Sequence, residues 1–255
     1  LLIENKQYHK ASTLRALPCF VDGLKQSHRK ILYGLFSKGK NSHEYKVAQI
    51  GAYIAEISMY QHGVTSLEDA MIKMAQDFPG SNNLPLLQPI GQFGSRIQNG
   101  ADAASSRYIF TKLFDFVHIL FDDRDSPSLT FLHEEQQSIE PQFYVPILPM
   151  IAVNGCQGIA TGFLCNIPQF SVEDIFAYIE SLLEGTTPYP LVPSVRGWKG
   201  HVEVGTDSWI YHGTFEVNDD RNVVTVTAIP PSMSIDKYTK MLVGLLQNKK
   251  ILSFT

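Results

Sequence analysis

Two neighbouring residues, Arg107 and Tyr108, have side chains that suit covalent chemistry on a phosphodiester. They follow the small residues 103–106 and lead into the β-forming residues 109–111. A tyrosine oxygen placed there could attack phosphorus and hold a broken strand as a phosphotyrosine, while the guanidinium neutralises charge on the five-coordinate phosphate. Resealing would then need no second activated substrate, because the bond energy is stored. The pair alone is weak evidence, since most of the 11 tyrosines are expected in the core or at its rim.

Basic residues are concentrated near the start of the chain, although the formal net charge is −4. Residues 1–50 hold nine lysines and arginines against three acidic residues, a balance of +6, so the rest of the chain carries −10. Such asymmetry is expected of a polyanion-binding surface on an otherwise acidic body. A helical face that is merely solvated would give the same composition, and the sequence leaves this alternative open.

The composition is typical of a globular protein, with 44% hydrophobic and 18% charged residues among 255. No apolar run approaches the roughly 20 residues that span a bilayer, so no membrane association is predicted. The chain opens at Leu1 without an initiator Met or a signal peptide, and we expect it to be part of a larger protein. Its three cysteines lack a C-x-x-C spacing, which predicts reduced thiols in an intracellular protein and no metal site.

The first third of the chain has the element order of a winged helix, in which a helix-turn-helix delivers basic side chains to DNA. The third helix begins with Thr-Ser-Leu-Glu at 65–68, which fits a capping box, and ends at Pro79. The predicted elements are helices at 26–38, at 45–59 and from 65 onward, then β-prone segments around 85–93 and 107–113.

The rest of the chain mixes loops, strands and helices, so the predicted fold class is α+β. An acidic turn at 122–127, a Gly-rich turn at 154–162 and a Pro-containing linker at 188–193 interrupt the regular elements. The predicted elements are a helix over about 172–184 capped by Ser171, strands near 200–205, 208–216 and 222–229, and a final helix over about 235–248.

Three motifs allow both a chemical and a structural interpretation. Gly34 to Asn41 nearly spell a P-loop, but Asn41 replaces the residue that binds magnesium and Gly34 falls inside a predicted helix. Asp123 and Asp125 could be a metal pair, although the surrounding residues favour a solvated turn. Ile159 is either a wedge between base pairs or a buried residue that holds the Gly-rich turn against the core, and the sequence favours neither.

The motifs, taken in order, resemble the breakage–reunion region of type IIA DNA topoisomerases. The resemblance covers almost the whole chain, and the Ser-Asn-Asn and Gln-Pro-Ile-Gly-Gln-Phe-Gly blocks are similar to the eukaryotic topoisomerase II branch. The matching blocks are residues 21–33, 46–49, 62–63, 80–83, 88–96, 107–111, 149–162 and 196–200.

The resemblance implies roles for nine residues. Tyr108 would be the nucleophile, and Arg107 would stabilise the transition state. Ile159 would intercalate into the cut DNA segment and bend it. The residues that would line this segment are Arg15, Lys25, Arg29, Lys30, Tyr60 and His62.

Three departures from the family pattern indicate a divergent member, of the kind that a large DNA virus of eukaryotes such as African swine fever virus could encode. Gln26 replaces the usual proline, Gln61 replaces the first histidine of His-His-Gly, and Cys156-Gln157 replaces Ala-Glu. The change at Gln61 leaves the local phosphate contacts in doubt, but not the nucleophile.

The resemblance also implies how the parent protein is organised. Residues 1–150 would form a winged-helix DNA-binding domain that carries the nucleophile, and residues 151–255 would begin a mixed α/β tower. The parent would act on double-stranded DNA as a homodimer, with Mg²⁺ and ATP bound outside this chain. It would work inside the cell, in the nucleus if cellular and in the host cytoplasm or nucleus if viral. The chain alone, without the ATPase and metal-binding domains, would be catalytically incomplete.

The predicted function is the DNA-binding and cleavage part of an ATP-dependent type II DNA topoisomerase. Such an enzyme cuts both strands through a transient phosphotyrosyl link, passes another duplex and reseals. The main alternative is a non-catalytic winged-helix DNA-binding or architectural protein in which Tyr108 is structural, and it would form no covalent adduct. A third hypothesis, a nucleotide-dependent hydrolase built on the near P-loop, predicts that the isolated chain binds ATP.

Overall fold

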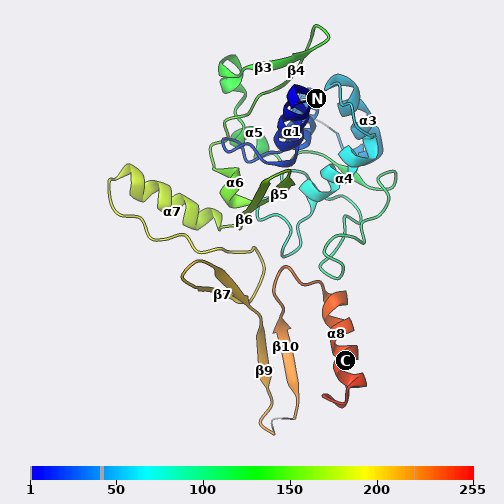
Figure 1. Ribbon diagram of the computed structural model, residues 1–255, viewed down its shortest axis with the longest axis vertical. Coiled ribbons are helices and arrows are strands. Elements are labelled where there is room, and N and C mark those ends of the chain that lie inside the picture. Colours follow the sequence, from blue (N-terminus) through cyan, green and yellow to red (C-terminus); the bar gives the residue numbers. More distant parts are fainter. Residues whose placement is uncertain (1, 41–42, 221) are drawn as a thin grey trace.

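Three helices pack against one another at the centre of the first half of the chain: α2 (Gln26–Phe36), α3 (Val47–Ile57) and α4 (Val64–Ala75). Their inward faces carry apolar residues at three- and four-residue spacings, and Ile31, Ile54 and Met71 are fully buried. The computed structural model describes residues 2–40, 43–220 and 222–255, and Figure 1 shows its mixture of helices and strands. The predicted helices and the α+β class are confirmed.

Gly34 lies inside α2, where the helix meets α3. A Cβ atom at this position would lie 2.5 Å from Ile54 Cγ1, so the close packing of the two helices requires glycine. A helical glycine facing another helix cannot be part of a phosphate-binding loop. The P-loop interpretation is therefore wrong at Gly34; Asn41 lies outside the described residues.

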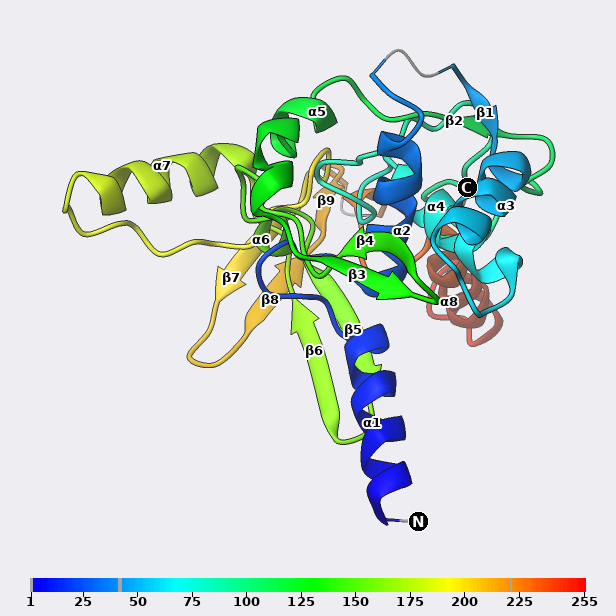
Figure 2. The ribbon, with the colours of Figure 1, turned by 90° about the horizontal axis from the view of Figure 1, so that it is seen from above.

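Helix α1 (Leu2–Ala16) was not predicted, because its sequence is polar on nearly all sides and shows no apolar stripe. It contacts strand β5 and lies alongside the β5–β6 hairpin (Figure 2). The predicted capping box at the start of α4 is also absent. The helix begins two residues earlier than Ser66, after Gly63, and has no side-chain cap.

Short antiparallel strands follow the three helices. Strand β1 (Tyr45–Lys46) pairs with β2 (Phe110–Thr111), and isolated bridges join Leu87 to Leu113 and Ile90 to Phe110. The predicted β segments around 85–93 and 107–113 therefore pair with each other, but only through isolated bridges.

Two hairpins and three short helices complete this part of the chain. The predicted Gly-rich turn at 154–162 is mostly strand, because β5 pairs with β6 up to Ala160 and Phe163. The bounds are β3 (Phe131–Glu134), β4 (Gln137–Pro141), β5 (Cys156–Ala160), β6 (Phe163–Ile167), α5 (Val117–Leu120), a 3₁₀ helix (Asp123–Ser128) and α6 (Met150–Val153).

The last third of the chain agrees closely with the sequence. Helix α7 (Val172–Leu183) begins as predicted at Ser171, whose hydroxyl accepts from the Asp174 N–H at 3.0 Å. The strand expected at 208–216 is divided at Gly213, where a Cβ atom would lie 2.3 Å from the Ala228 carbonyl oxygen. Figure 1 shows the later strands and the final helix below the rest. They are β7 (His201–Val204), β8 (Trp209–His212), β9 (Thr214–Val217), β10 (Val224–Ala228) and α8 (Ile235–Gln247).

The hydrophobic core extends beyond the expected domain boundary at residue 150. Phe170 and Ile175 belong to the same buried cluster as the residues of α2, α3 and α4. The Asn83 side chain, itself buried, donates to the carbonyls of Phe170 and Ser194 at 3.0 and 2.7 Å. The division at 150 stays a prediction. Across the described ranges, no helix is long and apolar enough to cross a membrane.

Candidate active site

Tyr108 lies on a loop that packs on the first turn of α3. The first N–H groups of a helix have no partner within it. In α3 the N–H groups of Val47 and Ala48 donate to the carbonyls of Ile109 and Ser106, at 3.0 and 3.2 Å. The backbone is therefore fixed on both sides of the Arg–Tyr pair.

The side chains of the pair point into solvent from this fixed backbone. Tyr108 is 71% exposed and Arg107 is also exposed, whereas the next residue, Ile109, is fully buried. The Tyr108 N–H donates to the Ser105 carbonyl at 2.9 Å, which closes a turn just before the pair. A phenol and a guanidinium held in this way can meet a phosphate that approaches from outside.

A second group of predicted site residues comes together between α1 and the loop that joins α3 to α4. Arg15 Nη1 lies 3.0 Å from His62 Nε2, and the rings of Tyr60 and His62 meet edge to face with centroids 5.4 Å apart. Burial raises the pKa of Tyr60, and the charge of Arg15 opposes this shift. No hydrogen bond or ion pair among the described residues joins this group to Tyr108.

Gln61, the departure from His-His-Gly, turns away from this group. Its amide donates a short hydrogen bond to the Glu134 carboxylate on β3. The residue thus ties the α3–α4 loop to the β3–β4 hairpin, and the exposed His62 stays beside Arg15.

Ile159 lies near the tip of the β5–β6 hairpin and is 80% exposed. The interpretation of a buried core residue is therefore wrong. The hairpin is held at its base, because Lys25 Nζ donates to the Gln157 carbonyl at 2.6 Å. A Cβ atom at Gly158 would lie 2.6 Å from the Ala16 carbonyl oxygen, so the strand touches the end of α1. An apolar side chain is thus presented to solvent on a supported strand.

Arg29 and Lys30 are buried, and this corrects the expectation that they line the DNA. Arg29 binds the Asp22 carboxylate through Nε and Nη2 at 2.8 and 3.2 Å. Lys30 Nζ lies 2.8 Å from the Glu140 carboxylate, which is fully buried. Buried charges need such partners. The sequence could not reveal them, because Glu140 is 110 positions away from Lys30.

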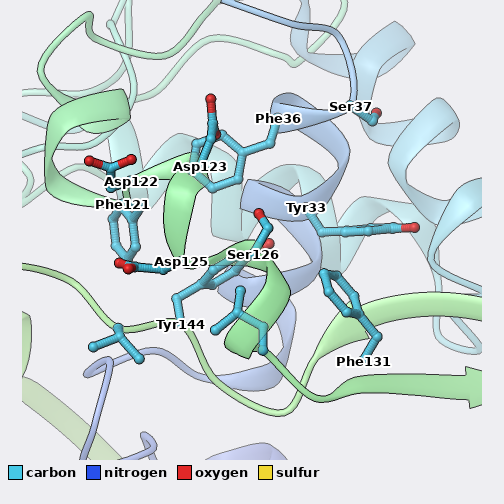
Figure 3. A pocket seen from close by; sticks show the side chains of 12 residues that line it. Tyr33, Phe36, Ser37, Phe121, Asp122, Asp123, Asp125, Ser126, Phe131 and Tyr144 are labelled. Carbon is cyan, nitrogen blue, oxygen red and sulfur yellow. The ribbon is translucent and has the colours of Figure 1, made fainter.

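A hollow of about 280 Å³ lies between α2 and the 3₁₀ helix (Figure 3). Its aromatic wall includes Phe36 and Tyr144, and Asp123 lies at its rim. Asp123 pairs with Lys40 at 2.9 Å, and hydrogen bonds from Arg124 lower the pKa of Asp122 to about 2. Over the described ranges, no three His, Cys, Asp or Glu residues are placed to hold a metal ion. A carboxylate-rich rim repels phosphate, so this hollow does not extend the DNA surface.

The comparisons with known proteins agree with this geometry. A family model described as DNA gyrase/topoisomerase IV matches residues 15–255. DNA topoisomerase 2-alpha of Rattus norvegicus is 43% identical over 217 residues, which cover 85% of this chain and 14% of that protein. DNA topoisomerase 2-alpha of Homo sapiens is 48% identical over 189 residues, which cover 74% and 12%. The chain thus spans only a small part of these curated relatives.

A solved structure is similar over nearly the whole chain. It is the DNA-binding, cleavage and re-ligation domain of Plasmodium falciparum topoisomerase II, with a TM-score of 0.92 and 40% sequence identity. The match covers 97% of this chain and 34% of that chain. Together with the family match over residues 15–255, this similarity shows that the chain belongs to the type IIA DNA topoisomerase family.

Proposed function

We propose that this chain is the DNA-binding and strand-cleaving part of a type II DNA topoisomerase, with Tyr108 as the nucleophile. The observation that carries the proposal is the exposed Tyr108 beside an exposed Arg107, on a backbone fixed at both ends to α3. A tyrosine with only a structural role would be expected to pack its ring, and this one does not.

The reaction would exchange one phosphate ester for another. The Tyr108 oxygen forms a bond to phosphorus, and the bond from phosphorus to one deoxyribose oxygen breaks. The phenol gives up a proton and the released sugar oxygen takes one up, so protons balance. Arg107 would neutralise charge on the five-coordinate phosphate, where one well-placed donor contributes about 10²–10³ in rate. Resealing is the reverse reaction.

The DNA surface would consist of the exposed residues around this loop. Arg15, Tyr60 and His62 form one contact group, and Lys25 supports the hairpin from which Ile159 would enter the duplex. Arg29 and Lys30 act behind this surface, because their ion pairs hold α2 in place. Their effect on DNA binding would be indirect.

The parent enzyme would cut both strands of one duplex, pass another through and reseal, as an ATP-dependent homodimer working inside the cell. Strand cleavage in the family needs Mg²⁺, which would be held by acidic residues of the parent outside this chain and would supply positive charge at the phosphate. Here the described residues supply the nucleophile, the neighbouring guanidinium and the DNA surface.

The decisive test is Tyr108→Phe in the full-length parent. We expect the phosphotyrosyl–DNA adduct and the relaxation of supercoiled DNA to be abolished, with DNA affinity almost unchanged, because only a hydroxyl is removed. Tyr189→Phe, at a tyrosine that is 90% exposed on a distant loop, is the matched control and should leave activity intact. Relaxation at a normal rate by Tyr108→Phe would refute the assignment and favour the non-catalytic DNA-binding protein.

A further inference from the structure

A hydrogen bond links α4 to the loop that carries Tyr108. Ser106 Oγ donates to Glu68 Oε2 at 2.8 Å, and both side chains are half-buried. Helix α4 begins at Val64, so Glu68 is too far along the helix to act in a capping box. Its carboxylate reaches instead to a residue 38 positions away in the sequence.

Ser106, the residue just before Arg107, is therefore held by two different helices. Its carbonyl accepts from the Ala48 N–H of α3, and its hydroxyl binds Glu68 of α4. The next fixed point is the Ile109 carbonyl, again on α3. Arg107 and Tyr108 form the short span between these two anchors.

The path of the Glu68 side chain depends on a glycine in α3. A Cβ atom at Gly51 would lie 3.1 Å from Glu68 Cγ, which is tighter than ordinary contact. The absence of a side chain at Gly51 leaves room for Glu68 to pass between α3 and α4 toward Ser106. The link is thus part of how the two helices pack.

We propose that Glu68 is a positioning residue for strand cleavage, which orients Arg107 and Tyr108 through its hydrogen bond to Ser106. This inference rests on the proposed function, because it takes Tyr108 as the nucleophile. A hydrogen bond to a carboxylate is roughly twice as strong as one between neutral groups, which suits an anchor. Orientation matters, because a misplacement of about 1 Å can reduce a rate by about 10²-fold.

The test measures the single-turnover rate of adduct formation and the DNA Kd in the full-length parent with Mg²⁺. Glu68→Ala and Ser106→Ala should each slow adduct formation about tenfold or more while leaving Kd unchanged, because DNA contacts are kept. The double variant should be no slower than the slower single variant, since both changes remove one bond. Glu68→Gln should keep most of the rate, because its amide oxygen still accepts from Ser106. Asp69→Asn, at the exposed neighbour on α4, is the control.

The outcomes separate this inference from the assignment of the nucleophile. A wild-type rate for Glu68→Ala, or additive losses in the double variant, would overturn the positioning role. A Glu68→Gln enzyme as slow as Glu68→Ala would also overturn it, because the charge and not the hydrogen bond would then act. Tyr108→Phe is measured in the same series. An adduct in that variant would refute the nucleophile itself, whatever the Glu68 variants do.

Discussion

The two arginines Arg107 and Arg29 show how surroundings decide the role of a charge. Arg29 binds Asp22 and the Leu24 carbonyl through its guanidinium, inside the protein. Arg107 is exposed beside Tyr108 and can approach a phosphate. Neutralising Arg29 would therefore leave a buried carboxylate without its partner, whereas neutralising Arg107 would change the reaction itself.

Arg107→Ala should slow both cleavage and resealing by about 10²–10³-fold, with a much smaller effect on DNA affinity. The reason is that its charge matters most when the phosphate is five-coordinate. Single-turnover cleavage and resealing rates, measured beside Kd, give the answer. Arg124→Ala removes another highly exposed arginine and should change neither rate. A defect confined to affinity would make Arg107 an ordinary phosphate anchor.

At this scale the sequence predicted the exposed residues better than the buried ones. Tyr108 and Arg107 belong to a local motif, and the structure places both on the surface. The partners of Arg29 and Lys30, and the link from Glu68 to Ser106, depend on residues distant in the chain. Local spacing carries no information about such contacts, so the sequence misplaced or missed them.

Among the elements, the β5–β6 hairpin carries the clearest functional feature. Ile159 pairs across the strands with Leu164, and both are largely exposed. The base of the hairpin contacts α1, and Lys25 holds the Gln157 carbonyl. The sequence indicated a turn here because of its glycines. Gly158 instead allows close contact with α1, a helix that the sequence pattern did not reveal.

Ile159→Ala should reduce DNA bending and cleavage while the fold stays intact. A wedge unstacks one base step, at a cost of about a few kcal/mol, and thereby stabilises a bent duplex. Because the side chain is 80% exposed, its truncation should change the unfolding free energy by only about 0.5 kcal/mol or less. Fluorescence transfer between dyes at the duplex ends measures bending, and a thermal melt measures stability.

Leu164→Ala is the control for the Ile159 experiment, because Leu164 is the cross-strand neighbour and is similarly exposed. A wedge at Ile159 predicts that Leu164→Ala bends DNA more than Ile159→Ala does. Normal bending by Ile159→Ala would end the wedge hypothesis.

Over the whole molecule, the charge asymmetry predicted from the sequence needs a new location. Of the basic residues near the start of the chain, Arg29 and Lys30 are neutralised inside, and Lys40 pairs with Asp123. The exposed basic residues Lys6 and Lys10 lie on α1, beside the hairpin that carries Ile159 (Figure 2). Composition predicted the polyanion surface, but only the fold shows which of its charges face solvent.

This distribution predicts which lysines set the salt dependence of DNA binding by the parent enzyme. Each phosphate contact contributes about 0.9 to the slope of log K against log salt. Lys10→Gln should flatten the slope by about this amount, whereas Lys240→Gln on the distant α8 should not. Lys30→Met should leave the slope unchanged but lower the unfolding free energy by about 3–5 kcal/mol, because it strands the buried Glu140. A flatter slope with Lys30→Met and an unchanged one with Lys10→Gln would return the DNA surface to α2.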